Sequence, residues 1–418
     1  MSATTVIHSP TDQERDLLES ISLYIHIPFC HAKCHYCDFN SYAGLLGWRS
    51  RYVRALVREI TLVGEAARRP DGQPRRCRTI FFGGGTPSLL RPAEVEEILA
   101  AARASFAVDD DAEITLEANP GTLERLNLAE VRATGLTRIS MGAQSFDAGL
   151  LKWMGRIHSP EEIVSAVQAA RAAGFDNLNL DFIFALPDQT MAQWRDTLER
   201  AVTLAPNHLS LYSLIVEPET PLFDWVAHGA VTPADDDLAA DMYRAAQEIV
   251  AAAGYQQYEI SNWAKPGHEC QHNLTYWHNL PYIGVGAGAH SYFDGRRFAN
   301  VRPVEGYVAA LSGDWQPHTG AVGIIGGPVA ESTQVSPDED MAETAILALR
   351  LNEGLDIDSF ERRFGTDFDG LYGKRIVDLI AWKILEQINI QGTRRLRLTE
   401  QGRLVGNEAF ERFLPESV

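Results

Sequence analysis

Three cysteines within a short segment are the most chemically distinctive residues of this sequence. Cys30, Cys34 and Cys37 stand in the stretch "SLYIHIPFCHAKCHYCDFNSY", and no fourth cysteine lies in their neighbourhood. Structural zinc sites typically take four ligands in paired units, and iron–sulfur clusters normally use four cysteines. Three cysteines at this spacing therefore indicate a metal cluster in which one iron is left open for a small-molecule ligand.

The other two cysteines do not complete a paired site. Cys77 precedes a predicted strand and is therefore expected at the end of the sheet opposite the cysteine loop. Cys270 lies in another region, and the sequence does not exclude it as a fourth ligand. Five cysteines in 418 residues do not build a disulfide framework and fit a reducing compartment. The N-terminus lacks the pattern of a signal peptide, and no apolar run approaches the ~20 residues of a membrane span. We therefore expect a cytoplasmic protein without a membrane span.

Strand-like and helical stretches alternate along the first half of the chain. Runs rich in β-branched and aromatic residues are separated by stretches with helical apolar spacing, which is typical of a parallel sheet covered by helices. Six such units predict an α/β fold, a partial (β/α)6 TIM-like barrel. The predicted strands are residues 23–27, 79–82, 114–117, 138–141, 178–184 and 209–214, and the predicted helices include residues 48–63, 92–104, 160–173 and 191–204.

A polar or glycine-rich cluster follows each predicted strand. The cysteine loop comes after the first strand, "GGGTP" after the second, "EANP" after the third and "GAQSF" after the fourth. "LDFIFALP" closes the fifth strand, and "EPETPL" follows the sixth. Since the loops after parallel strands open on one face of such a fold, we expect these segments to converge on one site.

The rest of the chain is less regular and indicates a second domain. A helix over residues 234–253 and a strand over 258–260 extend the barrel, and residues 318–336 are predicted to be a Gly-rich linker or exposed hairpin. From residue 337 the pattern predicts helices and a two-stranded wing. The expected parts are a flexible N-terminus (1–20), the barrel with its extension (21–300), a linker region (301–336) and a small C-terminal helical/winged domain (337–418).

The charge balance argues against a nucleic-acid partner. The sequence has 37 Lys and Arg against 56 Asp and Glu, a formal net charge of −19. Nucleic-acid binding requires a basic face, and a single short basic run in an acidic protein fits a solvated surface better. That run lies in the predicted wing and comprises Arg394, Arg395, Arg397 and Arg403.

Together the motifs resemble the radical S-adenosylmethionine (SAM) superfamily. The C-x3-C-x2-C spacing with Tyr36 before the last cysteine is its signature, and "FFGGGTPSLL", "RISMGAQSFD", "NLDFIFALPDQT" and "HNLTYW" are similar to the oxygen-independent coproporphyrinogen III oxidase group. Within that group, residues 20–415 most resemble the heme chaperones. The resemblance implies a radical SAM barrel in which Cys30, Cys34 and Cys37 bind a 4Fe-4S cluster and SAM chelates the open iron.

The resemblance also implies which residues contact SAM. Glycines after the second strand would bring the backbone close to the ligand, although they also suit a tight βα turn. Glu117 and Asp181 interrupt apolar strands and would need partners such as the ribose hydroxyls or ammonium group of SAM, although charged residues near strand ends are often only solvated or capping. The implied SAM contacts are Tyr24, Tyr36, Gly84, Gly85, Thr86, Glu117, Gln144, Arg156 (to the carboxylate) and Asp181, and by weaker correspondence Ile215 and His290.

A segment of the less regular region is the candidate heme site. The resemblance to heme chaperones favours His272 as an axial ligand, with Tyr276 and Trp277 offering flat apolar surface to the macrocycle. A hydrogen-bonded structural histidine is one alternative. A zinc site is the other, with ligands drawn from His268, Cys270, His272 and His278.

The resemblance predicts a heme chaperone that binds a 4Fe-4S cluster, SAM and heme and transfers heme to acceptor hemoproteins. The alternative is an oxygen-independent coproporphyrinogen III oxidase, a radical SAM decarboxylase of porphyrin biosynthesis. Its pattern has a further cysteine two residues after the third, where this chain has Phe39, which weighs against it. A cluster protein that binds SAM without turnover is a third interpretation. The sequence leaves open whether SAM is cleaved, which would need an electron donor, and whether the protein is a homodimer.

Overall fold

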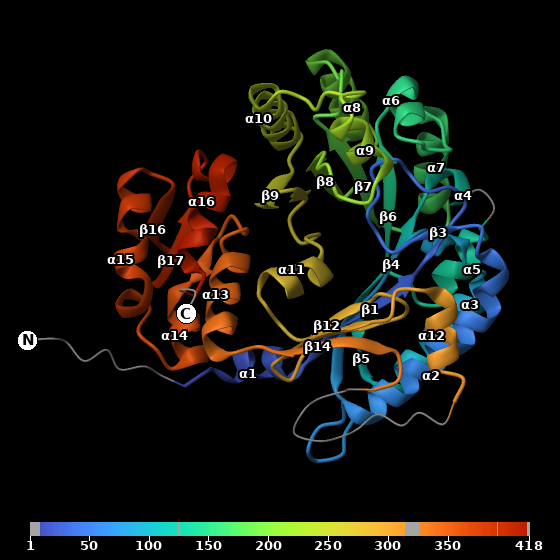
Figure 1. Ribbon diagram of the computed structural model, residues 1–418, viewed down its shortest axis with the longest axis horizontal. Helices are drawn as coiled ribbons and strands as arrows, with labels where there is room; N and C mark the ends of the chain where they lie inside the picture. The colour runs from blue at the N-terminus through green and yellow to red at the C-terminus, as the bar shows by residue number, and fades with distance from the viewer. Residues whose placement is uncertain (1–8, 124–125, 314–325, 391, 416–418) are drawn as a thin grey trace, which may run out of the picture.

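Parallel strands in chain order form the centre of the computed structural model, which describes residues 9–123, 126–313, 326–390 and 392–415. Helices lie along the outer side of these strands (Figure 1). The predicted partial (β/α)6 barrel is confirmed. Its strands are β1 (Ile21–Ile27), β4 (Arg76–Gly84), β5 (Ala107–Ala118), β6 (Arg138–Gln144), β7 (Asn177–Phe184) and β8 (His208–Ser213), and its long helices are α2 (Arg49–Ala66), α3 (Pro92–Ser105), α7 (Pro160–Ala172) and α8 (Met191–Thr203).

Local sequence explains where these elements run. β1 has the sequence "ISLYIHI" and is buried along nearly its whole length, as expected for a parallel strand covered on both faces. Helices α7 and α8 begin at capping boxes, in which Ser159 pairs with Glu162 and Thr190 pairs with Gln193. The strands and the helix starts are therefore encoded by short stretches of sequence.

The sheet extends beyond the barrel units and does not close. Its 12 strands run in the order β14-β13-β12-β11-β1-β4-β5-β6-β7-β8-β10-β9. Strands distant in sequence thereby stand beside β1 and its cysteine loop. The added strands are β11 (Tyr282–Val285), parallel to β1, and the antiparallel β12 (His290–Phe293), β13 (Arg296–Asn300), β14 (Val329–Gln334), β10 (Asn262–Ala264) and β9 (Gln256–Glu259).

Shorter elements connect and flank the strands. β2 (Phe29–Cys30) pairs with β3 (Tyr42–Ala43) at the two ends of the cysteine loop. Within the described residues, no helix is both long and apolar enough to cross a membrane. The other elements of this part are α4 (Pro120–Leu123), α5 (Leu128–Ala133), α6 (Ala148–Trp153), α9 (Pro221–Ala227), α10 (Asp236–Ala252), α11 (Gln271–Trp277), α12 (Val304–Ala310) and the 3-10 turns Leu46–Trp48 and Pro87–Leu89.

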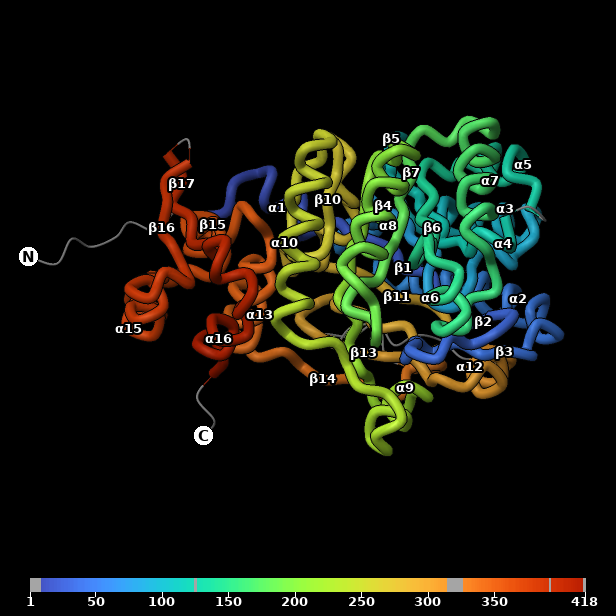
Figure 2. Tube along the Cα trace, turned by 90° about the horizontal axis from the view of Figure 1, so that it is seen from above, coloured from blue at the N-terminus to red at the C-terminus, as the bar shows by residue number. Residues whose placement is uncertain are grey.

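A small domain with its own hydrophobic core lies at one end of the molecule (Figure 2). Its core includes Phe360, Phe368 and Leu396, and its three-stranded sheet has the order β15-β17-β16. β16 and β17 form the predicted two-stranded wing. The elements are α13 (Pro337–Ala348), β15 (Leu355–Asp356), α14 (Ile357–Phe364), α15 (Phe368–Ala381), β16 (Leu385–Ile390), β17 (Thr393–Leu398), α16 (Gly406–Phe410) and the turns Gly402–Val405 and Glu411–Phe413.

Two segments expected to be a flexible terminus and a linker region contain helices and a strand. Residues 12–19 form α1 (Asp12–Glu19), because Thr11 and Glu14 make a capping box and Glu14 also pairs with Arg362 of α14. In the predicted linker region, residues 304–310 form α12 and residues 329–334 form β14, which gains hydrogen bonds from β13. Residues 1–8 of the predicted N-terminus and residues 314–325 of the linker region lie outside the described residues.

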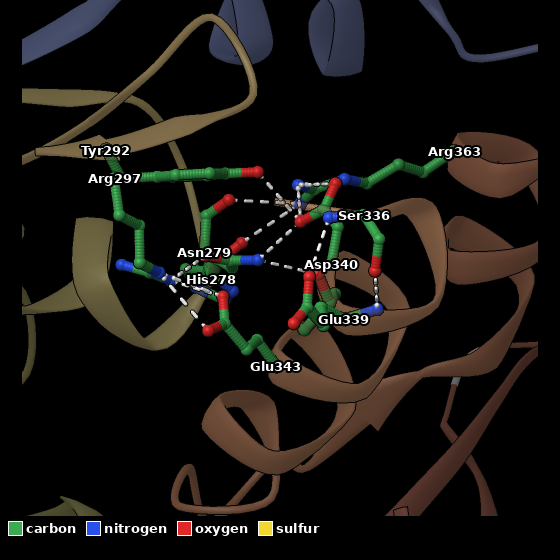
Figure 3. Close-up of polar contacts among 10 residues, drawn as sticks. His278, Asn279, Tyr292, Arg297, Ser336, Glu339, Asp340, Glu343 and Arg363 are labelled. Carbon is green, nitrogen blue, oxygen red and sulfur yellow. Dashed lines mark hydrogen bonds and ion pairs between the residues drawn. The ribbon is translucent and has the colours of Figure 1, made fainter. Parts of the chain in front are cut away.

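A polar cluster joins the C-terminal domain to the barrel (Figure 3). Asp340 of α13 accepts hydrogen bonds from Asn279 Nδ2 and Tyr292 Oη, each at 2.8 Å. Arg363 of α14 donates to the same Asp340 carboxylate at 3.2 Å and to the carbonyl oxygen of Asn279 at 3.1 Å. The domain thereby holds the chain just after α11, the helix that carries His272.

Asp340→Ala should weaken the attachment of the C-terminal domain. It removes a carboxylate that accepts hydrogen bonds from both sides of the contact, a loss of roughly 2 kcal/mol for a charged group. Denaturant unfolding should shift to lower concentration. The matched control is Asp338→Ala, an exposed carboxylate on the same helix. Equal unfolding curves for the two variants would contradict the role given to Asp340.

Candidate functional site

A cavity of about 460 Å³ gathers segments that follow the parallel strands. Residues at the end of each of the six barrel strands, or in the segment after it, line this cavity, because these strands run in a common direction. Tyr24, also predicted to contact SAM, lines a neighbouring cavity instead. The predicted residues that line the first cavity are Cys30, Cys34, Tyr36, Cys37, Gly84, Gly85, Thr86, Glu117, Gln144, Arg156 and Asp181, with Ile215.

Backbone contacts hold the loop that carries the three cysteines. β2 and β3 pair at its ends, with Cys30 opposite Ala43. In its middle, the backbone N–H of His35 donates to Met154 at 3.1 Å, and the carbonyl of His35 accepts from Leu222 at 3.0 Å. Contacts with the end of α6 and with α9 therefore hold the middle of the cysteine loop in place.

Each of the three thiols has a side-chain hydrogen-bond partner, which for Cys37 Sγ is Ser41 Oγ at 3.9 Å. Thr86 Oγ1 lies 3.6 Å from Cys30 Sγ, and Arg156 Nη1 lies 3.5 Å from Cys34 Sγ. Burial is the largest cause that raises the pKa of the Cys30 and Cys37 thiols. Thiolates at these positions therefore need a positive partner, and the charge of bound iron would provide one.

The arrangement of possible metal ligands does not suit a single ion. Among the residues that the structure describes, no three His, Cys, Asp or Glu side chains surround one position that a metal ion could occupy. Three thiols that line one cavity suit a cubane cluster, because in such a cluster each thiolate binds a different iron. The zinc alternative around Cys270 has no such grouping either. Cys77 and Cys270 are buried and do not line the cavity.

The two glycines after β4 allow this turn to pack directly against the cysteine loop. Gly84 has a φ of +111°, and a Cβ there would lie 2.6 Å from the ring of His26. A Cβ on Gly85 would lie 2.7 Å from the carbonyl oxygen of Phe29 and 3.0 Å from Cys30 Sγ. Side chains at these positions are excluded by His26 of β1 and by the start of the cysteine loop, in addition to any ligand.

Two carboxyl groups line the cavity from β5 and β7, the strands on either side of β6. Glu117 accepts the backbone N–H of Gly84 at 3.1 Å, and Asp181 accepts from Asn179 at 2.7 Å and Ser140 at 3.2 Å. Burial, assisted by the Asp181 charge, raises the pKa of Glu117 to about 8, and burial also raises the pKa of Asp181. Donors from a ligand, such as hydroxyl or ammonium groups, would stabilise their charged forms.

Arg156 is positioned to bind both the cysteine loop and an anionic group. Its Nη2 donates to the carbonyl oxygen of Gly142 at 2.6 Å, whereas its buried Nε has no partner among the described residues. A carboxylate ligand would satisfy that nitrogen. Nearby, Gln144 has a φ of +66°, a backbone conformation that costs energy for a residue with a side chain. The donor set therefore fits an amino-acid ligand such as SAM.

A second cavity of about 580 Å³ adjoins the first and shares Asp38, Phe39, Gly84 and Glu117 with it. Its charged and aromatic residues include Tyr282 and Arg302, which were not predicted as site residues. They reach the site because β11 pairs with β1 and because Asn40 Nδ2 donates to the carbonyl oxygen of Arg302 at 2.9 Å. No local sequence pattern marks such residues. The wall of this cavity also includes Tyr24, Tyr276 and His290.

The predicted heme segment is divided between the cavity wall and the protein interior. His272 is 1% exposed; its Nδ1 lies 2.7 Å from Thr79 Oγ1 and its Nε2 lies 2.9 Å from Tyr276 Oη. Its ring stacks on Phe81 at 5.0 Å. Trp277 lines neither cavity and instead has the Arg350 guanidinium above its ring at 4.5 Å. As placed, the His272 imidazole has no free nitrogen for an iron.

Two protein families match parts of the chain. Residues 24–201 match the radical SAM superfamily, and residues 335–405 match the HemN C-terminal domain. The first match covers the strands and loops that line the cysteine cavity, except β8 and the segment that follows it. The second covers most of the small domain that docks through Asp340.

Curated relatives resemble the chain along nearly its whole length. The heme chaperone HemW of Bacillus subtilis is 36% identical over 94% of this chain and 99% of its own. The heme chaperone HemW of Lactococcus lactis is 34% identical over 95% of this chain and 98% of its own. Among solved structures, coproporphyrinogen III oxidase (HemN) from Escherichia coli has a TM-score of 0.77 and 23% identity, covering 96% of this chain and 92% of that one. That structure shares the fold.

Glu117→Gln should stabilise the protein more at high pH than at low pH. Burial raises the pKa of Glu117 from 4.5 to about 8, so the folded state holds a proton that the unfolded state releases. Stability is therefore lost as the pH rises from 4.5 towards 8, and a neutral amide removes that loss. Thermal midpoints of both proteins near pH 5 and near pH 8 test this. If the thermal midpoints of the variant and the wild type differ by the same amount at both pH values, Glu117 does not hold the proton assigned to it.

Gly85→Ala should displace the cysteine loop. The added methyl would meet Phe29 and Cys30 at distances that no relaxed contact allows, a strain of roughly 1–3 kcal/mol. We expect a lower thermal midpoint and less iron after anaerobic reconstitution. Gly47→Ala is the matched control, because its Cβ would meet nothing within 4 Å. Normal iron content in both variants would contradict this packing argument.

Proposed function

Because this chain belongs to the HemW family of radical SAM proteins, we propose that it is a heme chaperone, which binds heme and passes it to acceptor hemoproteins. Support comes from the curated relatives of that name, which match it from end to end. The same match includes both the barrel and the C-terminal domain. The resemblance of the fold to coproporphyrinogen III oxidase makes that enzyme the competing function.

Phe39 is the observation that favours the chaperone over the oxidase. Its ring is 59% exposed and lies between the two cavities, at the position where the oxidase pattern has a further cysteine. A phenyl ring offers neither a thiolate nor a labile hydrogen, so it cannot replace that cysteine in chemistry. It does enlarge the apolar surface of the site, to which the exposed side chains Ile157, Tyr212 and Ile215 also contribute.

The three cysteines would hold a 4Fe-4S cluster, and the cavity above them would hold SAM. When bound, such a cluster supplies an open iron for the methionyl group and an electron for reductive cleavage of SAM. In this proposal Arg156 binds the SAM carboxylate through its unpartnered Nε. Glu117 and Asp181 accept hydrogen bonds from ligand hydroxyl or ammonium groups, and Tyr36, Gly84, Thr86 and Gln144 complete the wall.

The chemistry of the site also suggests where and with what partners the protein works. Three thiols that must stay reduced, two of them partly exposed, suit the cytoplasm. If SAM is cleaved, an electron donor is required. The acceptor hemoproteins would have to approach the face on which the two cavities open.

A side-by-side assay of heme and coproporphyrinogen III tests the proposal. The anaerobically reconstituted chain should bind one heme with a saturable Soret change. With SAM and a reductant it should leave coproporphyrinogen III unchanged. Formation of protoporphyrinogen would overturn the chaperone assignment in favour of the oxidase. Cys34→Ala serves as the control, because it should lose the cluster while the second cavity remains intact.

The kinetics of transfer distinguish a chaperone from a passive heme-binding protein. Heme handed over within a complex should move to an apo-hemoprotein at a rate that rises with acceptor concentration. Heme that first dissociates moves at a rate independent of the acceptor. Acceptor-independent rates for every hemoprotein tried would contradict the proposed transfer, even if heme binding is tight.

A further inference from the structure

The second cavity has a wall with several aromatic rings, as a site for a flat, aromatic ligand requires. It encloses about 580 Å³, within the range of small-molecule sites, and adjoins the cavity of the cysteines. Tyr276 and Tyr282 stand perpendicular with their ring centroids 4.7 Å apart, and Tyr24 and Phe39 also contribute rings to the wall. Aromatic side chains of this kind provide apolar surface for a conjugated macrocycle.

The histidines around this cavity differ in whether an imidazole nitrogen is free. His26 is buried, with Nδ1 at 3.0 Å from Tyr24 Oη and Nε2 at 2.8 Å from the carbonyl oxygen of Asn40. His272 has both nitrogens engaged and does not line the cavity. His290, at the start of β12, is exposed and its ring has no hydrogen bond or ion pair with any residue described here. Of the three, His290 alone can coordinate iron without breaking a contact.

One cation faces the same cavity. Arg302 is the only arginine or lysine among the lining residues, and its guanidinium forms no ion pair or hydrogen bond with the described part of the chain. Asp38, Glu117 and Glu331 also line the cavity, so Arg302 is the lining residue that would attract a ligand carboxylate. In a chain with a net charge of −19, a single unpaired arginine in an aromatic cavity fits an acidic, otherwise apolar ligand.

We propose that heme occupies this second cavity, with His290 as its axial ligand and a propionate bound by Arg302; this inference rests on the proposed heme-chaperone function. The heme edge would then lie beside Asp38, Phe39, Gly84 and Glu117, the residues shared with the cysteine cavity. His272 and Thr79 support the wall from behind by holding Tyr276 in place. Heme and SAM thereby occupy adjoining cavities of one site.

Hemin titration of the full-length, cluster-reconstituted protein tests the ligand assignment through the Soret band. His290→Ala should weaken hemin binding about tenfold or more and change the Soret position, because iron loses its nitrogen ligand. Added imidazole should restore the spectrum in His290→Gly. His228→Ala is the control, since His228 is exposed and lines neither cavity. His272→Ala should keep the wild-type Soret position.

Hemin and its dimethyl ester test the propionate contact. Arg302→Gln should weaken hemin binding about tenfold or more, as expected for loss of a charged hydrogen bond. The same substitution should not change binding of the dimethyl ester, which has no carboxylate. If His272→Ala fails to fold, the imidazole rescue and this pair of ligands still decide the proposal.

The outcomes separate this inference from the proposed function. A wild-type Soret band and affinity in His290→Ala overturn the assignment of His290 while leaving the heme chaperone intact. If the Soret band is lost in a folded His272→Ala variant and kept in His290→Ala, the axial ligand is His272. If Arg302→Gln weakens binding of hemin and of its dimethyl ester equally, Arg302 does not bind a propionate. If the wild-type protein shows no saturable hemin binding, the proposed function fails as well.

Discussion

The contact between the turn after β4 and the cysteine loop is the constraint on which the rest of the site depends. Because Gly85 has no side chain, the backbone of the turn reaches Phe29 and Cys30, and Thr86 comes within 3.6 Å of the Cys30 thiol. The same turn offers the N–H of Gly84 to Glu117. One close approach between two loops thus positions a thiol, a hydroxyl and a carboxyl group around a single cavity.

Burial gives these groups their chemical character. Glu117 of β5 and Asp181 of β7 are removed from water, and this burial raises the pKa of each carboxyl. Arg156 lines the same cavity and carries a buried nitrogen that has no partner among the described residues. These unmet interactions are costly in an empty site, and they are the interactions that a zwitterionic ligand would satisfy.

Much of the site nearest the cysteines could be predicted from sequence, because each part follows its own strand. The strand runs, the capping boxes of α7 and α8 and the loops that carry Cys30 and Asp181 are local features. The environment of His272 is not local. Its burial depends on Thr79 and Phe81 of β4, nearly two hundred residues earlier in the chain, so a sequence motif could not show that both nitrogens are engaged. The short strands β11–β14, which bring Arg302 to the site, escaped prediction for the same reason.

The central claim is that one chain holds heme directly beside its cluster and SAM. A crystal structure of the heme-loaded, cluster-reconstituted protein, with an anomalous difference map at the iron edge, tests it most directly. The account predicts two iron peaks, one bounded by Cys30, Cys34 and Cys37 and the other in the second cavity next to the His290 imidazole. A heme iron peak outside that cavity, or bound to His272 after movement of α11, would contradict it.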